Sequence, residues 1–419
     1  MVHAHSHGSA GPAAPRTTFL LVVTLVSALL LTLAGLWMLW PDGGDVPGRV
    51  PAKAEGTSFV DVTVAGPADP ATGGIPVELP SGESSRMQSP GPSVPLAEGD
   101  RLTAVDISQV AQPGVDPLVF MDYQRDLPIG LLAVAYALVV LLVARWRGLA
   151  AMAGLGVAFA VLLGFTMPAL LAGESAIGVA LVTSSLVMFA TLYLAHGLSA
   201  RTSTALLGTL VGLALTAAIA TWASGAAQIT GTTDEASAFL PSAAPAADLR
   251  GIALCGIVLA GMGVLNDVTI TQASAVWELR GVAPTASRSE LFTRAMRIGR
   301  DHIASTVYTI AFAYVGASLP LLMMVWLVDQ SPATALTSGE IAEEVVRTLA
   351  GSIGLVLAIP VTTAIATLTV PGPTTEVAGL VASDPGSDPG SDPESDQELM
   401  ATVSETWARS DTGPYREDA

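Results

Sequence analysis

Eight stretches of this chain are long, apolar and almost free of charge, and they limit the possible folds more than any other feature. A helix needs about 20 residues to cross a hydrocarbon core that is about 30 Å thick. Segments that approach this length lie at 18–39, 127–144, 149–172, 175–195, 203–223, 251–274, 304–328 and 348–370. The sequence therefore predicts an all-α polytopic membrane protein with about eight transmembrane helices.

The composition excludes an ordinary cytosolic enzyme. Only 13% of the 419 residues are charged and 51% are hydrophobic, whereas about 25% of the residues in a soluble domain are charged. So few charges cannot cover the surface of a soluble protein of this length. The single cysteine, Cys255, excludes an internal disulfide and a zinc site built from cysteines.

Charge and hydropathy divide the chain into five predicted parts. These are a cytoplasmic histidine-containing tail at 1–17, a signal-anchor helix at 18–39, an acidic extracytoplasmic region at 40–126, a seven-helix membrane domain at 127–370 and a disordered acidic cytoplasmic tail at 371–419. The last part contains the repeat SDPG-SDPG-SDPE, in which proline and glycine break regular structure and the acidic charges repel each other. The acidic flanks argue against nucleic acid as a partner. The expected partner is the lipid bilayer, and a homo-oligomer or a further membrane protein stays open.

Arginine in the short loops predicts the orientation in the cell membrane. The loops after the second, fourth and sixth predicted spans contain Arg145, Arg147, Arg201, Arg280, Arg288, Arg294, Arg297 and Arg300, and the loops between them contain Arg250 and Arg347. Cytoplasmic loops carry an excess of Lys and Arg. Both termini are therefore expected in the cytoplasm, and the region 40–126 is expected outside.

The region 40–126 shows the alternation of strands. Apolar and polar residues alternate at 58–64, 74–79, 101–105 and 106–110, and turn-forming glycines and prolines separate these stretches. Alternation with period two between turns is typical of short strands. We expect a small β-rich insert. A flexible acidic loop is the alternative, because about 70 residues make a marginal core without disulfides.

Asn266 and Asp267 are polar residues within the sixth predicted span. A charge near the bilayer centre costs about 3 kcal/mol or more, so such a residue is a functional candidate. Asp267 shares one helical stripe with the small or hydroxyl residues Gly256, Ala260, Gly263, Thr271 and Ser274. Small residues let helices approach closely, so Asp267 is expected to face the bundle. It either pins a neighbouring helix through a buried hydrogen bond, or binds a cation or carries a proton.

The seventh span begins with Arg300, Asp301 and His302, and it continues with hydroxyl groups at Ser305 and Thr309. His196, at the inner end of the fourth span, lies at a similar depth. The four ionisable residues His196, Asp267, Asp301 and His302 are therefore predicted to share an inward-facing polar vestibule. The segment Ile341–Leu349 is predicted as a short interfacial helix that leads into the eighth span, and its Glu343, Glu344 and Arg347 can meet headgroups and water.

The N-terminal histidines His3, His5 and His7 are weak candidates for loose metal binding. No Walker A loop, HExxH pair, GxSxG elbow or dinucleotide fingerprint occurs in the sequence. We therefore expect neither an enzyme nor a cofactor.

Several stretches resemble the YibE/F-like family of bacterial multi-pass membrane proteins. They are ARWRG (144–148), LAHG (194–197), LNDVTITQASAVWEL (265–279), RIGRDHIASTVYTIAFAYVGASLPLL (297–322) and IAEEVVRTLAGSIGLVLAIP (341–360). Asp267 and Arg300-Asp301 match the family pattern, whereas Thr309 stands where that pattern has asparagine. The resemblance implies membrane topology over about 240 residues and implies no particular chemistry.

Two functions fit these observations. The first is a secondary transporter or permease for a small solute or ion, which the buried aspartate and the polar stripe favour. The second is a membrane scaffold or sensor that acts through its extracytoplasmic region or its acidic tail. A polar cavity that reaches the middle of the membrane would favour the transporter.

Overall fold

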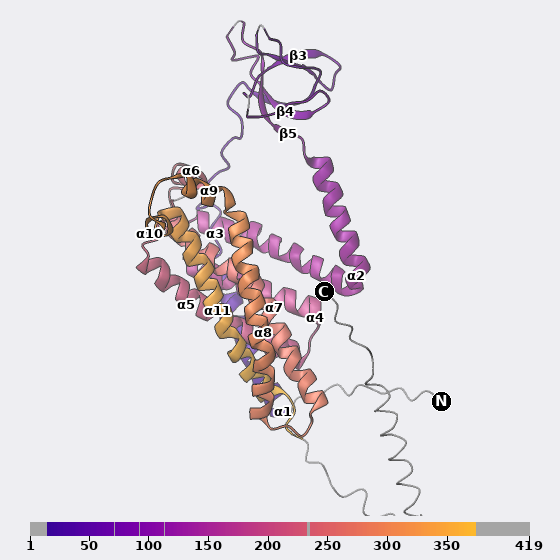
Figure 1. The fold of residues 1–419 in the computed structure, drawn as a ribbon, viewed down its shortest axis with the longest axis vertical. Helices are drawn as coiled ribbons and strands as arrows, with labels where there is room; N and C mark the ends of the chain where they lie inside the picture. The colour runs from indigo at the N-terminus through magenta and orange to yellow at the C-terminus, as the bar shows by residue number, and fades with distance from the viewer. Residues whose placement is uncertain (1–14, 71, 92, 113, 233–234, 374–419) are drawn as a thin grey trace, which may run out of the picture. The chain divides into compact units, whose positions relative to one another are not determined.

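A computed structural model describes residues 15–70, 72–91, 93–112, 114–232 and 235–373. It contains a small β-barrel and a set of long helices (Figure 1). His3, His5 and His7 and the repeat-bearing tail 374–419 lie outside the described residues, so the predictions for them stay predictions.

Long apolar helices dominate the described chain, as predicted. They are α1 (Pro15–Met38), α2 (Asp126–Val161), α4 (Ala176–His196), α5 (Ala200–Ala226), α7 (Leu249–Val282), α8 (Arg288–Ala317) and α11 (Gly339–Thr369). The short helix α9 (Leu319–Leu327) follows α8. Among the described residues, six helical stretches are long and apolar enough to cross a membrane, and α8 with α9, bent by 68°, makes a seventh. The structure therefore supports six or seven such helices, and the predicted number of eight is not confirmed.

The predicted and observed numbers of spans differ because of the stretch Asp126–Leu171. It counts as one candidate span in the structure, whereas the sequence predicted two spans there. Arg145 breaks this stretch with φ 54° and ψ −132°, which is a left-handed backbone for a residue with a side chain. Gly148 follows the break and is buried. A Cβ at this position would lie 2.6 Å from the carbonyl oxygen of Val140, so the close approach requires glycine. The predicted second and third spans thus lie on either side of a sharp turn within α2.

Proline accompanies two further irregularities in the long helices. A π-helical turn, η1 (Leu162–Thr166), precedes α3 (Met167–Leu171), which contains Pro168. Pro320 lies in the first turn of α9, directly after the bend that ends α8. Proline removes a backbone donor and clashes with the preceding turn, so helices bend or restart at these places. The shorter helices α6 (Glu235–Ala243) and α10 (Pro332–Leu336) complete the described chain.

Helices α5, α7 and α11 pack closely through glycines. On α5, a Cβ at Gly212 would lie 3.0 Å from Ala358 of α11 and from Leu265 of α7. A Cβ at Gly354 of α11 would overlap with Thr216 of α5. Small residues permit such close approach of membrane helices. The three helices therefore form the centre of the bundle.

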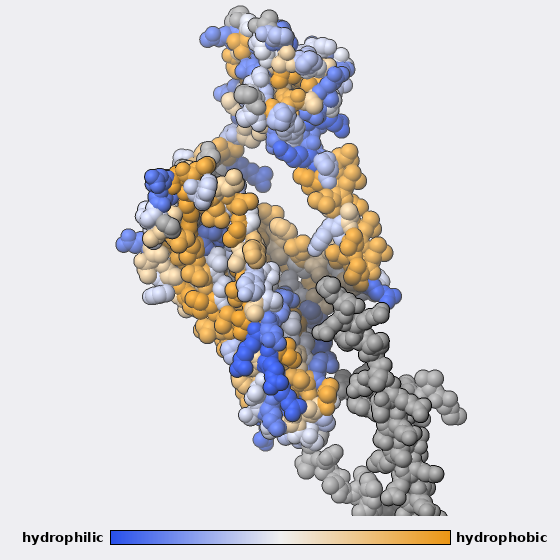
Figure 2. Space-filling model, in the orientation of Figure 1, coloured by the Kyte–Doolittle hydropathy of each residue, from blue (hydrophilic) through white to orange (hydrophobic). Residues whose placement is uncertain are grey.

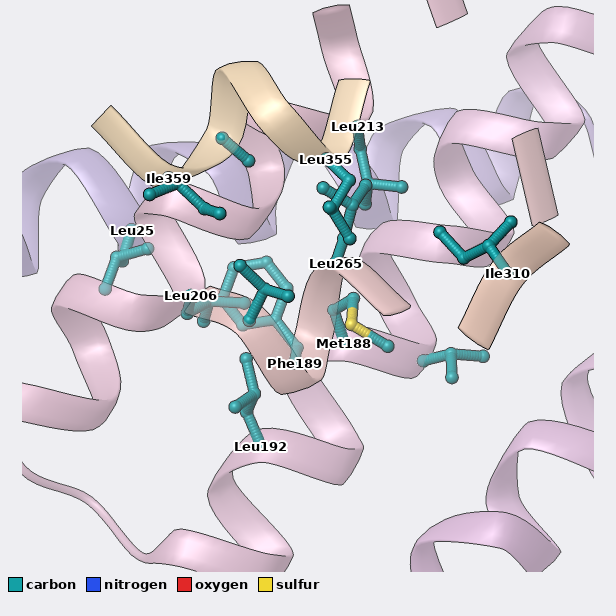
Figure 3. Close-up of a cluster of buried hydrophobic side chains, with 13 residues drawn as sticks. Leu25, Met188, Phe189, Leu192, Leu206, Leu213, Leu265, Ile310, Leu355 and Ile359 are labelled. Carbon is teal, nitrogen blue, oxygen red and sulfur yellow. The ribbon is translucent and has the colours of Figure 1, made fainter. Parts of the chain in front are cut away.

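The apolar core joins six helices around this centre (Figure 3). Leu25 of α1, Phe189 of α4, Leu206 and Leu213 of α5, Leu265 of α7, Ile310 of α8, and Leu355 and Ile359 of α11 belong to one buried cluster. These side chains come from segments far apart in the sequence. Their packing fixes the face that each helix turns toward the bundle.

Residues 58–123 fold into a closed five-stranded barrel. Its strands are β1 (Ser58–Val64), β2 (Ile75–Glu78), β3 (Ser84–Gln88), β4 (Arg101–Asp106) and β5 (Leu118–Tyr123), in the order β1-β2-β3-β5-β4. The pair β3–β5 is parallel, and the other four pairs are antiparallel. Val77, Met87, Leu102 and Ala104 are fully buried in its core. The predicted β-rich insert is confirmed, and the alternative of a flexible loop is wrong for this segment.

Candidate functional site

Asp267 of α7 and His302 of α8 form the ionisable pair of this candidate site. Asp267 Oδ2 lies 4.0 Å from His302 Nε2, which is within ion-pair distance but too long for a hydrogen bond. The Asp267 side chain is 74% exposed, and that of His302 is 29% exposed. His302 Nε2 is itself buried and has no hydrogen-bond partner among the described residues. A protonated imidazole here would face the carboxylate directly.

The prediction that Asp267 faces into the bundle is wrong. Helix α7 buries the opposite face, with Leu265, Val268 and Gln272 turned toward the neighbouring helices. A Cβ at Gly256 or Gly263, on the same stripe as Asp267, would meet no atom within 4 Å. The stripe of small residues is therefore an uncovered face of α7, because the apolar and hydroxyl-bearing face packs against α5 and α11 instead.

The other predicted polar residues of α7 and α8 lie on the same two helices as the pair. Asn266 Oδ1 is buried and has no hydrogen-bond partner among the described residues. Thr271 is exposed on the same face of α7 as Asp267, and Asp301 and Arg300 are exposed on α8. The hydroxyl groups of Ser305 and Thr309 are exposed and donate to carbonyl oxygens of α8 itself: Ser305 Oγ to His302 O, and Thr309 Oγ1 to Ser305 O, both at 3.0 Å.

These residues give α8 a polar half and an apolar half. Figure 2 shows hydrophilic residues gathered along the lower part of α8 and hydrophobic residues along its upper part. The lower part is the N-terminal half, in which Arg300, Asp301 and His302 lie. The Asp267–His302 pair thus lies where the polar half of α8 passes α7.

His196 does not join this pair. It ends α4 and is exposed, and the charged groups that act on it are Arg201 and Arg147. The predicted vestibule of four ionisable residues is therefore only partly assembled: the structure brings Asp267 and His302 together and places His196 among arginines. Similar depth in the sequence pattern did not reveal that the charged neighbours of His196 are Arg201 and Arg147.

Gln272 is a buried polar residue that sequence reasoning missed. It is 2% exposed, and its Nε2 donates to Ala295 O of α8 at 2.9 Å and to Thr363 Oγ1 of α11 at 2.7 Å. Thr209 of α5 and Thr269 of α7 share a further buried hydrogen bond of 2.6 Å. Such interhelical hydrogen bonds stabilise the packing of membrane helices. The signal in the sequence is a polar residue on the face of α7 opposite Asp267.

Arg347 holds two carboxylates near the start of α11. Its Nη1 donates to Glu344 at 2.7 Å and its Nη2 donates to Glu343 at 3.0 Å. The three side chains are between 12% and 27% exposed. Ile341–Leu349 leads into the eighth predicted span, as expected, but as the first part of the continuous helix α11, which begins at Gly339, and not as a short helix of its own. The three charges therefore face one another as well as the surroundings.

The described residues contain no group of three or more His, Cys, Asp or Glu side chains that could hold a metal ion. The pair Asp267–His302 offers one oxygen and one nitrogen ligand. A carboxylate and an imidazole are both groups that can accept and donate a proton, and such pairs occur in the proton relays of membrane proteins.

A bundle of long apolar helices with an ionisable pair among them defines the class, a polytopic helical membrane protein. The model of the family described as YibE/F-like protein matches residues 132–372. This match covers more than half of the chain, so the protein belongs to the YibE/F-like family, as the resemblance predicted. Comparison with curated proteins and with solved structures gave no match.

Proposed function

We propose that the protein is a secondary transporter for a small solute or ion, and that the pair Asp267–His302 carries the coupling proton. The observation that carries this proposal is the 4.0 Å approach of a carboxylate and an imidazole from two membrane-length helices. Charged residues inside membrane spans mark proton relays and ion paths, because their burial in lipid is costly. No enzymatic reaction and no cofactor are part of the proposal.

The uncovered face around Asp267 supports a path that contains water. Asp267, Thr271, Asp301, Ser305 and Thr309 are all exposed, and they lie on two adjacent helices. A carboxylate that faced hydrocarbon would lose its hydration, whereas one that faces water keeps it. We infer that this face of α7 and α8 borders an aqueous path in the cell membrane, with both termini in the cytoplasm.

The test is flux in liposomes that contain the full-length protein and a trapped pH-sensitive dye. Gradients of inorganic cations, small carboxylates and amines are imposed one at a time. One class should produce a change of internal pH that depends on the protein. Asp267→Asn should abolish this change, because the amide cannot bind or release the proton, and His302→Gln should reduce it strongly.

Glu278→Gln is the matched control, because Glu278 is an exposed acid of the same helix outside the pair. This variant should transport at the wild-type rate. Wild-type flux in Asp267→Asn would contradict the proposed role of the pair. A wild-type protein that moves none of the solutes would favour the second candidate function.

The second candidate is a sensor or scaffold, which the folded barrel favours. A polar hollow of about 540 Å³ on the barrel is lined by Asp61, Thr63, Glu78, Arg101 and Gln124, among others. Such a hollow can bind a small polar molecule. A sensor would bind a ligand there and would show no flux in the liposome assay.

A further inference from the structure

An apolar cavity of about 290 Å³ lies between α8 and α9 on one side and α10 and α11 on the other. Its wall is formed largely by hydrophobic side chains, among them Val315, Leu321, Val345 and Leu349. The volume is near the lower end of the range of about 300–1,000 Å³ found for small-molecule sites. The cavity is separate from the Asp267–His302 pair, whose residues do not line it.

Glu344 is the one charged residue among those that line this cavity in the described part of the chain. It belongs to the cluster with Glu343 and Arg347, whose formal charge is −1 because two carboxylates share one guanidinium. Arg347 Nε is buried and has no hydrogen-bond partner among the described residues. Arg347 does not line the cavity, so the cluster offers a carboxylate to a cation there and no accessible donor to an anion.

The cavity lies at helix ends, where headgroups meet a bilayer. Ser318 lines it directly after the end of α8, and Leu336 lines it at the end of α10, shortly before α11 begins. The surface of α9 beside it is apolar and exposed: Leu319 is 51%, Met323 is 61% and Trp326 is 85% exposed. Exposed tryptophan and apolar side chains at a helix end are typical of the interface between lipid tails and headgroups.

We propose that this cavity binds a membrane phospholipid whose headgroup carries both an ammonium and a phosphate. One acyl chain lies along the apolar wall, and the ammonium pairs with Glu344, the charged residue that lines the cavity. Charge complementarity selects this lipid, because a net charge of −1 beside an apolar cleft repels an anionic headgroup and attracts an ammonium. The proposal does not depend on the transport function.

Native mass spectrometry of the full-length, delipidated protein tests this proposal. The probes are phosphatidylethanolamine and phosphatidylglycerol with identical acyl chains, each added at a series of concentrations. The wild type should retain phosphatidylethanolamine more strongly. Glu344→Gln should weaken its binding by roughly fivefold, the factor that corresponds to about 1 kcal/mol of lost charge pairing, and should remove the preference over phosphatidylglycerol.

Ala311→Phe is the second variant, because it fills the cavity from α8 and leaves the charged cluster intact. It should lower the retention of both lipids. Glu278→Gln, which removes an exposed acid away from the cavity, should bind as the wild type does. Equal retention of the two lipids by the wild type, or wild-type retention by Ala311→Phe in a protein of unchanged melting temperature, would overturn the proposal.

Discussion

At the scale of single residues, two glycines of α11 show how closely the central helices pack. A Cβ at Gly354 would overlap with Thr216 of α5, whereas a Cβ at Gly351 would meet Gly261 Cα at 3.9 Å, an ordinary contact. Thr216 cannot move easily, because its Oγ1 donates to Gly212 O at 2.9 Å. Gly354 therefore marks a point where the helix backbones approach each other, and Gly351 leaves room for a methyl group.

This difference predicts opposite results for one substitution at two sites. Gly354→Ala should destabilise the bundle by about 1–3 kcal/mol, as overpacked cores do. Gly351→Ala should be neutral or stabilising, because alanine favours a helix over glycine by about 1 kcal/mol. Thermal unfolding of both variants in the same detergent measures this. Similar melting temperatures for the two variants would contradict the close approach at Thr216.

Residue patterns in the sequence identified Asp267 and His302 and did not give their orientation. The stripe of Gly256, Gly263 and Asp267 resembles a packing face, but α7 buries the other side, where Gln272 binds Thr363 and Ala295. Both faces of α7 contain small residues and hydroxyl groups. Only the partners decide which face is covered, and those partners come from other helices, α5, α8 and α11.

At the scale of elements, the strand pattern predicted three of the five strands of the barrel. Strand β1 lies at the predicted 58–64, and β2 and β4 lie within one residue of the predicted 74–79 and 101–105. Strand β4 ends at Asp106, so the predicted strand 106–110 does not form. Strand β3 was missed because the stretch SSRMQ is polar with one inward residue, Met87. Strand β5 was missed because LVFMDY begins with an apolar run that does not alternate.

The junction between β5 and α2 predicts a measurable pKa. Arg125 donates to Asp122 at 2.8 Å, and this bond lowers the pKa of the Asp122 carboxyl below its ordinary value. A lowered pKa in the folded state stabilises the junction above the ordinary pKa of aspartate, and this contribution is lost as the pH falls through the lowered value. Both side chains are more than half exposed, so the effect on total stability is small.

Arg125→Ala should therefore raise the pKa of Asp122 toward its ordinary value. Carbon NMR of the labelled carboxyl groups in the full-length protein measures the titration directly. Arg49→Ala, which removes an exposed arginine from the connection before the barrel, is the control and should leave the Asp122 titration unchanged. An unchanged pKa in Arg125→Ala would show that the backbone N–H of Tyr123, which also donates to Asp122, holds the carboxylate by itself.

At the scale of the whole molecule, the arginine pattern predicts which loops are outside the cell. A cysteine introduced at Ser93, between β3 and β4, should react with an impermeant maleimide in intact cells. A cysteine at Ser289, at the start of α8, should react only after the cells are opened. Both positions are exposed, so accessibility of the side chain does not limit the reaction. Cys255→Ala removes the background thiol, and the reverse labelling would contradict the predicted orientation.

The sequence predicted the class and the family of the molecule, and the number of spans was harder to predict. Hydropathy locates apolar stretches, but it does not show whether a break turns the chain back or only bends it. Arg145 and the bend before Pro320 are such breaks, and their angles depend on local backbone geometry. The distinction matters because it decides whether the stretch counts as one span or two. That number decides on which side of the membrane every later loop lies.

The two connections of the barrel differ greatly in length, and this difference has a mechanical consequence. Residues 39–57, which contain no helix or strand, connect α1 to the barrel, whereas Gln124 and Arg125 alone connect the barrel to α2. The long connection has no regular structure between its ends, and the short one is held by the contacts of Arg125 with Asp122 and with the Tyr123 ring. We therefore expect a displacement of the barrel to be passed on to α2 more directly than to α1.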